Sequence, residues 1–250
     1  MLWLKLTLVP LFLLGVSLVA RRWGPRVAGL FAGLPLVTGP ILGFMAVEQG
    51  TTFGAAGARA ALGGVAGAVT FALVYSHRAL RGPWPQALSL ALTAWAALAL
   101  LLQLLPGALA VQAALALGAL ALAPRLRPAL PALPPAAPVG AGGLALRMAA
   151  GAGLTLAVTG AAAWLGPRWS GVLAVFPLLS TVIAVDVQRR QGAAHAAVLL
   201  CSMLPAFNAF SAFCAVLALG YAQGWLGAAI ALAVAVALGV QLVTVRLLRR

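Results

Sequence analysis

Acidic side chains are almost absent from this sequence, which contains Glu48, Asp186 and no other carboxylate side chain. These two residues lie in separate apolar segments, so they cannot form the acid/base pair or the metal-binding cluster that many enzymes need. No glycine-rich phosphate-binding motif is present either. We therefore do not expect enzyme activity, and we expect no cofactor and no metal ion.

Cysteine is scarce as well. Cys201 and Cys214 stand thirteen residues apart in one apolar segment, a spacing that places them on different faces of a helix. Neither a disulfide nor a metal-binding pair is expected from them.

Charged residues make up 7% of the sequence, against roughly 25% in a soluble domain, whereas 64% of the residues are hydrophobic. Apolar runs of about 20 residues recur along the chain, a pattern typical of helical membrane proteins. The net charge of +14 would suit a nucleic-acid-binding protein, but the basic residues lie between apolar runs, where they orient a chain in the bilayer. The sequence thus predicts an all-α polytopic membrane protein whose partner is the lipid bilayer and not nucleic acid.

The apolar runs divide into nine expected transmembrane helices. The run over 86–123 is too long for one span, and Pro106-Gly107 splits it, because proline breaks a helix and glycine permits a turn. The first run ends at Arg21-Arg22 and has a counterpart later in the chain, so we interpret it as a retained helix rather than a signal peptide. The expected spans are 3–20, 27–47, 52–76, 86–105, 107–123, 143–165, 169–187, 193–218 and 225–245.

The basic residues test this count. Nine spans place thirteen of them on one side of the membrane and three on the other, whereas merging the two runs around Pro106 gives six against ten. Cytoplasmic loops are enriched in Lys and Arg. We therefore expect the N-terminus outside, the C-terminus in the cytoplasm, and a proline-rich cytoplasmic connector over 124–138. Because alanine and arginine usage fits a GC-rich bacterial source, we expect the bacterial inner membrane.

The sequence matches itself when it is shifted by 142 residues. Residues 24–50 align with 166–192 without a gap, and ten of the 27 positions are identical. Alanine- and leucine-rich segments align by chance, but the shared Gly-Pro-Arg start, the shared proline and the Gln-Gly end are not such matches. An odd number of spans separates equivalent positions, so the second copy must be inverted. We expect a four-helix repeat at 1–106, a linking helix and connector at 107–142, and an inverted four-helix repeat at 143–250.

Each copy carries the same short pattern. A basic or aromatic residue (Arg26 or Trp169) is followed by Ala-Gly or Ser-Gly, a proline six residues after that glycine, and Gln-Gly at the helix end. In this pattern each copy resembles the GlpM-type small membrane proteins, which are short four-helix chains of poorly known function. The resemblance implies a duplicated and fused inner-membrane protein, and it implies little about chemistry.

The two copies of the second span are the ones that the sequence interrupts. Proline removes a backbone donor and frees a carbonyl, while glycine lets the chain bend and lets a ligand approach. Inverted repeats with broken helices recur in secondary transporters, whose substrate sites lie at the breaks near the midplane. Kinking and close packing are the alternative explanation. The candidate substrate-binding residues at the breaks are Gly33, Pro35, Thr38, Gly39, Pro40, Pro177, Ser180 and Thr181.

Four further polar residues within the spans are candidates. Asn208 and Ser211 are three residues apart in the eighth span, where they either contact the substrate or join helices by hydrogen bonds. Arg59 either binds an anionic substrate, extends to the membrane surface or pairs with Glu48. Asp186 either couples transport to protons or pairs with an arginine one helical turn later.

The third span is rich in glycine. Gly63 and Gly67 are four residues apart, a spacing that suits close packing in the protein interior. The tryptophans mostly flank the spans as an aromatic belt, and Trp95 is the internal exception.

These features favour a secondary transporter or exporter of a small neutral or anionic solute, in which one repeat rocks against the other. The scarcity of carboxylates argues against a pump for metal cations. A membrane scaffold that supports the assembly of a partner, or a lipid-translocating protein, would carry the same spans. The sequence names neither the solute nor the coupling ion, and it is compatible with a homo-oligomer.

Overall fold

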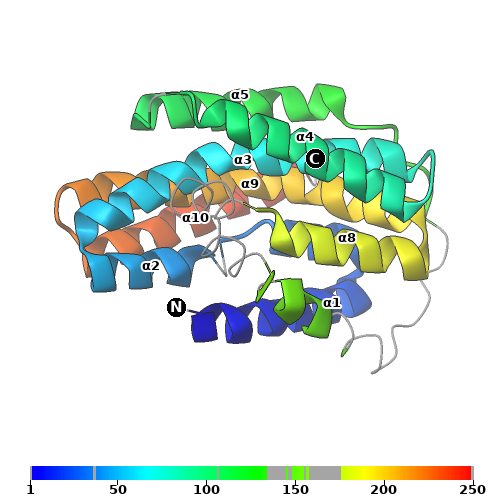
Figure 1. Ribbon diagram of the computed structural model, residues 1–250, viewed down its shortest axis with the longest axis horizontal. Coiled ribbons are helices and arrows are strands. Elements are labelled where there is room, and N and C mark those ends of the chain that lie inside the picture. Colours follow the sequence, from blue (N-terminus) through cyan, green and yellow to red (C-terminus); the bar gives the residue numbers. More distant parts are fainter. Residues whose placement is uncertain are drawn as a thin grey trace.

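A computed structural model describes residues 2–35, 38–105, 107–133, 145, 148–154, 156–157 and 176–248, and the regular structure in these ranges is helical (Figure 1). The all-α prediction is therefore confirmed for this part of the chain. Most of the predicted span 143–165 and the first part of 169–187 lie outside the described residues, as does the end of the connector over 124–138. The helices are α1 (Leu2–Ala32), α2 (Thr38–Gln49), α3 (Thr51–Ala79), α4 (Trp84–Leu102), α5 (Leu109–Leu126), α8 (Leu178–Gln191), α9 (Ala193–Ala222) and α10 (Gly227–Leu248).

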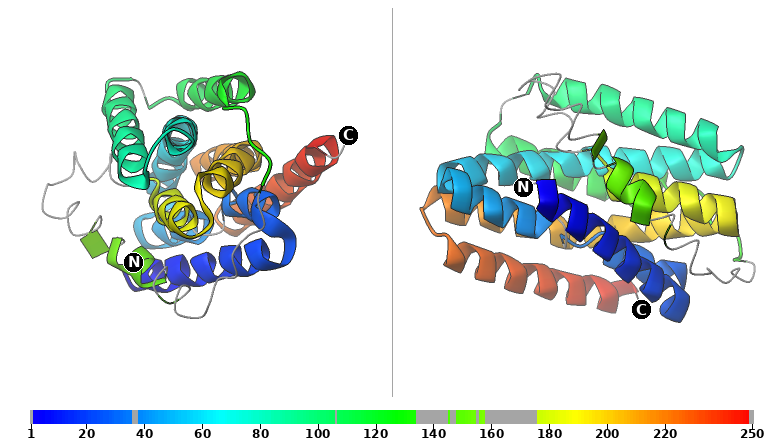
Figure 2. Two further views of the ribbon diagram at one scale, coloured as in Figure 1. Left: turned by 90° about the vertical axis from the view of Figure 1, so that its right-hand side faces the viewer. Right: turned by 60° about the horizontal axis from the view of Figure 1, so that its bottom comes forward.

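Five of these helices, α3, α4, α5, α9 and α10, are long and apolar enough to cross a membrane. The 29 residues of α3 and the 30 residues of α9 reach about 44 and 45 Å, more than the roughly 30 Å of a hydrocarbon core. These two are also the most enclosed of the five. They pack against each other along the centre, with the other helices around them (Figure 2). The five helices indicate an integral membrane protein.

The long apolar run over 86–123 forms two helices, as predicted. α4 ends at Leu102, and the three residues that follow it bond back to the carbonyls of its last turn before α5 begins at Leu109. At the far end of α5, the His77 ring donates from Nε2 to the Leu126 carbonyl over 2.7 Å. This bond joins the end of α5 to the end of α3, beside the start of α4, so α4 and α5 are antiparallel.

The second span is interrupted in the first copy, as predicted, and in the second copy its described part begins with two non-helical residues. In the first copy, α1 is kinked at the non-helical Gly24, with φ of 83°, and ends at Ala32. The chain then turns over 33–35, and α2 starts at Thr38. In the second copy, Phe176 and Pro177 are not helical and α8 starts at Leu178. α2 has 12 residues and α8 has 14, so they are about 18 and 21 Å long and neither reaches across a bilayer. Both are half-length helices.

Each half-length helix is followed at once by a long helix. Gly50 joins α2 to α3 and Gly192 joins α8 to α9, with φ of 88° and 93°. Only glycine adopts such a backbone without strain. Shifting α3 by 142 residues gives 193–221, and shifting α4 gives 226–244, which are close to the bounds of α9 and α10. The Gln-Gly pairs at 49–50 and 191–192 therefore lie at turns of similar geometry, each between a half-length helix and a long one.

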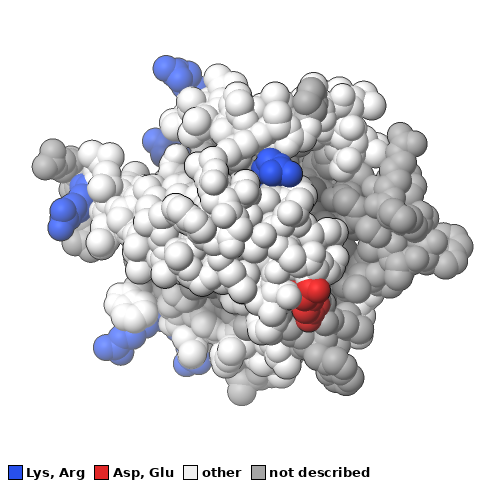
Figure 3. Space-filling view, turned by 90° about the vertical axis from the view of Figure 1, so that its left-hand side faces the viewer, with Lys and Arg blue, Asp and Glu red and all other residues white. Residues whose placement is uncertain are grey.

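The ends of α3, α5 and α8 lie at one end of the helix bundle, on the right in Figure 1, and basic residues end or follow these helices. There the Gln188 Nε2 donates to the Gly82 carbonyl over 3.3 Å, which joins the end of α8 to the turn between α3 and α4. The opposite end faces the viewer in Figure 3, where an acidic group lies at the surface and most of the basic groups in view lie toward the rim. This asymmetry agrees with the expected sidedness of the loops. The basic residues that follow or end α3, α5 and α8 here are Arg78, Arg81, Arg125, Arg127, Arg189 and Arg190.

Candidate functional site

The first break lies against the middle of α9. A Cβ atom at Gly33 would lie 2.6 Å from the Ala206 Cβ and 2.8 Å from the Met203 carbonyl oxygen. One turn earlier, a Cβ at Gly29 would lie 2.3 Å from the Leu199 carbonyl oxygen. Small residues four apart let two helix backbones approach this closely. Sequence reasoning proposed Gly33 as a bend and missed Gly29, although the four-residue spacing was the signal for this packing.

Beyond Gly33, the chain turns into α2 alongside α9. The Pro35 carbonyl accepts the Gly39 N–H over 2.8 Å, and a Cβ at Gly39 would lie 3.2 Å from the Phe213 ring. Thr38 is half-buried, whereas Pro40 is exposed. The first-copy candidates thus form one short segment, in which Gly33 and Gly39 lie against α9.

The second break is fixed by an aromatic pair. The Phe176 ring meets the Trp95 ring edge to face at 5.1 Å between centroids. Trp95 in turn covers Gly67 of α3, where a Cβ would lie 3.0 Å from the Trp95 Cδ1. Pro177 is buried and caps α8. The predictions that Trp95 is internal and that Gly67 packs in the interior are confirmed, and together they place the start of α8 beside the middle of α3.

Ser180 and Thr181 are both buried in the first turn of α8. The Thr181 N–H donates to the Pro177 carbonyl over 2.9 Å, but the Thr181 Oγ1 has no hydrogen-bond partner although the residue is 8% exposed. A buried hydroxyl without a partner is costly. Five other helical hydroxyls avoid this cost by donating to the carbonyl four residues earlier, in Ser17, Thr70, Ser76, Thr93 and Ser202.

Asn208 and Ser211 face different surroundings despite their spacing. Asn208 is exposed, and its Nδ2 donates to the Pro205 carbonyl over 3.0 Å. Ser211 is 5% exposed and its Oγ has no partner. The structure therefore does not bring these two polar groups together.

The two ionisable candidates lie away from the breaks. Arg59 is half-buried on α3, and no salt bridge joins it to the exposed Glu48, both of which lie in the described part of the chain. The Asp186 Oδ1 lies 2.6 Å from the Arg190 Nε, one helical turn later. The predicted ion pair at Asp186 is confirmed, while its proton-coupling role stays a prediction.

The two half-length helices point their N-terminal ends toward the middle of the bundle. α2 lies toward the left end in Figure 1 and α8 toward the right end, and the right panel of Figure 2 agrees. Each packs chiefly on the long helix that follows it. Neither carries an acidic residue in its first turn. Because the first N–H groups of a helix lack intrahelical acceptors, two ends with partial positive charge face the interior from opposite sides.

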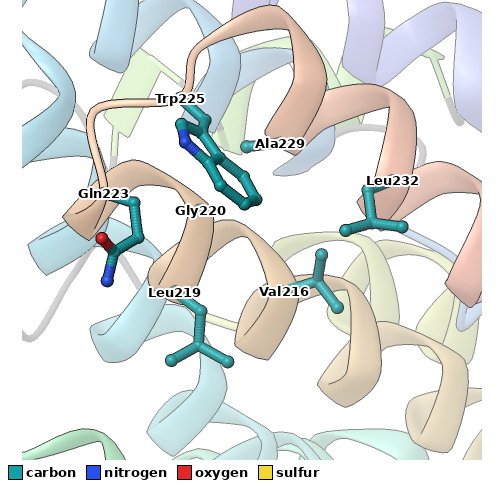
Figure 4. A pocket seen from close by; sticks show the side chains of 7 residues that line it. All are labelled: Val216, Leu219, Gly220, Gln223, Trp225, Ala229 and Leu232. Atoms are coloured by element: carbon teal, nitrogen blue, oxygen red, sulfur yellow. The ribbon is translucent and has the colours of Figure 1, made fainter.

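A pocket elsewhere is explained by packing. It lies at the turn between α9 and α10 and is largely apolar (Figure 4). Gly220 allows the close contact here, because a Cβ would lie 2.5 Å from the Ala229 Cβ. The Trp225 N–H donates to the Gly220 carbonyl over 2.9 Å, which closes the turn. We assign no solute to this pocket, whose lining residues are Val216, Leu219, Gly220, Gln223, Trp225, Ala229 and Leu232.

No protein-family model, curated protein or solved structure matches this chain. The resemblance of each copy to GlpM-type proteins therefore stays a prediction.

Proposed function

We propose that this chain is a secondary transporter or exporter of a small neutral or anionic solute in the bacterial inner membrane. The observation that carries the proposal is the matched pair of half-length helices. α2 and α8 are too short to cross a bilayer, begin at interruptions beside the long central helices, and approach the middle from opposite ends. This arrangement is the one that secondary transporters use to expose backbone groups to a solute.

The chain is built, in this proposal, from two inverted four-helix repeats joined by α5. The matched bounds of α3 with α9 and of α4 with α10 support the duplication, and the equivalent glycine turns do so independently. The five long helices, α1, the two interrupted spans and the expected span over 143–165 make nine. The basic end would then face the cytoplasm.

The breaks supply the polar groups for binding. Irregular backbone inside a membrane is tolerated only where protein buries it or where it lines a cavity. Thr38, Ser180 and Thr181 lie in the first turns of the two half-length helices, so they are the side chains placed to assist these backbone groups. Rocking of one repeat against the other would expose the breaks to each side in turn.

Aqueous access to the breaks tests the proposal without knowledge of the solute. In a Cys201→Ser, Cys214→Ala background, we would place one cysteine at Thr38 or Thr181 and treat right-side-out and inside-out vesicles with a membrane-impermeant maleimide. A transporter should label at the half-buried Thr38 position and at the buried Thr181 position from the aqueous phase. The matched control is Thr70→Cys, because Thr70 is a partly buried threonine of α3 away from the breaks.

The rates of labelling decide the outcome. Break cysteines that react no faster than the Thr70 control would overturn the proposal. The scaffold alternative makes the opposite prediction, since the breaks should stay closed while a partner protein co-purifies with the chain.

A further inference from the structure

The first turn of α8 contains four backbone N–H groups, and two of them have backbone acceptors. The Leu178 N–H donates to the Phe176 carbonyl over 2.8 Å and the Thr181 N–H donates to the Pro177 carbonyl over 2.9 Å. Between them lie the amides of Leu179 and Ser180, at the helix end whose partial charge is about half a positive elementary charge. Such helix ends bind anions in many proteins.

The Thr181 hydroxyl is an independent sign of a ligand at this helix end. It is buried and has no partner, whereas Thr70 in α3 satisfies its own hydroxyl by donating to the Ala66 carbonyl over 2.9 Å. Side chains of an α-helix tilt toward its N-terminus. The unpartnered Oγ1 belongs to the same helical turn as these amides, where it would donate to the same ligand.

The surroundings favour a negative charge over a positive one. The first turns of α8 and α2 contain no acidic residue. Of the carboxylates in the described chain, Glu48 is exposed at the far end of α2, and Asp186 is held by Arg190 more than one turn beyond Thr181. A cation at the N-terminus of α8 would meet a like partial charge, whereas an anion is attracted by this helix end.

We infer that the transported solute is a small monovalent anion, inorganic or carboxylate, bound by the Leu179 and Ser180 amides of α8 together with the Thr181 hydroxyl. This inference rests on the proposed transport function. A single charge fits because the described first turns offer amides and hydroxyls but no Lys or Arg to balance a second charge.

The test is anion-dependent thermal stability of the purified full-length chain. Wild type, Thr181→Val and Thr70→Val would be titrated with chloride, nitrate, formate and acetate at constant ionic strength, with gluconate as the replaced anion. At least one of these anions should raise the unfolding midpoint of wild type. Loss of the hydroxyl should weaken this protection by about 5- to 30-fold in concentration. The Thr70→Val variant should titrate like wild type, because its hydroxyl is used within the helix.

A second variant guards against misfolding. Thr181→Ser keeps the hydroxyl and should titrate within about three-fold of wild type, a change below 1 kcal/mol. Protection by chloride and nitrate alone would assign an inorganic anion, and protection by formate and acetate alone would assign a carboxylate. The inference is overturned if no anion protects the protein or if Thr181→Val responds like wild type. Maleimide access to the breaks would in that case still support transport, of a neutral solute.

Discussion

At the scale of single residues, two glycines determine where the half-length helices turn into the long ones. Gly192 has φ 93° and ψ 170°, and Gly50 has φ 88° and ψ 159°. A Cβ added at either position would meet no atom within 4 Å. The requirement for glycine is therefore conformational, since this region of backbone space is nearly closed to other residues.

Gly192→Ala should lower stability by about 1–3 kcal/mol through backbone strain alone. The matched control is Gly118→Ala in α5, which also meets no atom within 4 Å but sits in a regular helix. There alanine should be neutral or stabilise by up to about 1 kcal/mol. Thermal unfolding midpoints of the purified variants measure both effects. A Gly192→Ala protein as stable as Gly118→Ala would contradict the strained turn.

Residue identity alone predicts which groups are unusual but not which way they face. The sequence marks Asn208 and Ser211 as costly in an apolar helix, and both were expected to act together. In the structure one is exposed and the other buried. Thr181 gained its significance only from the absent bond to the carbonyl four residues earlier. Such facts depend on neighbouring helices that lie far away in the sequence.

At the scale of elements, two glycines let the end of α1 and the turn after it approach α9. They are Gly29 and Gly33. Gly29→Ala would place a Cβ 2.3 Å from a backbone carbonyl, which cannot swing aside as a side chain does. We expect a loss of about 1–3 kcal/mol from overpacking. Gly43→Ala is the control, because its Cβ would lie 3.5 Å from the Ile230 Cδ1, an ordinary contact. Unfolding midpoints that fall equally in both variants would argue against a specific backbone contact.

The start of α8 is predicted to depend on Trp95. This side chain is 4% exposed and packs on Phe176 and Gly67. Trp95→Ala should destabilise the protein by about 3–5 kcal/mol, because a large buried ring leaves a cavity. Trp225→Ala removes a tryptophan that is 53% exposed and should cost less. Chemical or thermal unfolding compares the two, and equal losses would show that Trp95 is not the anchor.

Element boundaries followed from the sequence where proline and glycine act locally. The division between α4 and α5 and the interruption before α2 were both predicted from such residues. In the second copy, α8 begins at Leu178, after the non-helical Phe176 and Pro177. Its position depends on the contact of Phe176 with Trp95, which joins two distant parts of the chain.

At the scale of the whole molecule, the basic end and the antiparallel half-length helices belong to one arrangement. The charge distribution alone predicts an odd number of spans. Basic loops lie on the cytoplasmic side, and each additional crossing moves all later loops to the opposite side of the membrane. The sequence could not place α2 and α8 relative to the long helices, since that depends on packing between elements. The two half-length helices are placed by α3 and α9, which lie side by side and on which α2 and α8 pack.

The orientation of the bundle is open to a direct test at its two ends. Arg127 is exposed after the end of α5 at the basic end, and Gln223 is exposed in the turn between α9 and α10 at the other. In the Cys201→Ser, Cys214→Ala background, Gln223→Cys should react with impermeant maleimide in intact spheroplasts, and Arg127→Cys should react only in inside-out vesicles. The reverse pattern would place the basic end outside and contradict the positive-inside assignment. Labelling of both positions from one side would mean that the long helices do not cross the bilayer, and the half-length helices would then have no midplane at which to meet.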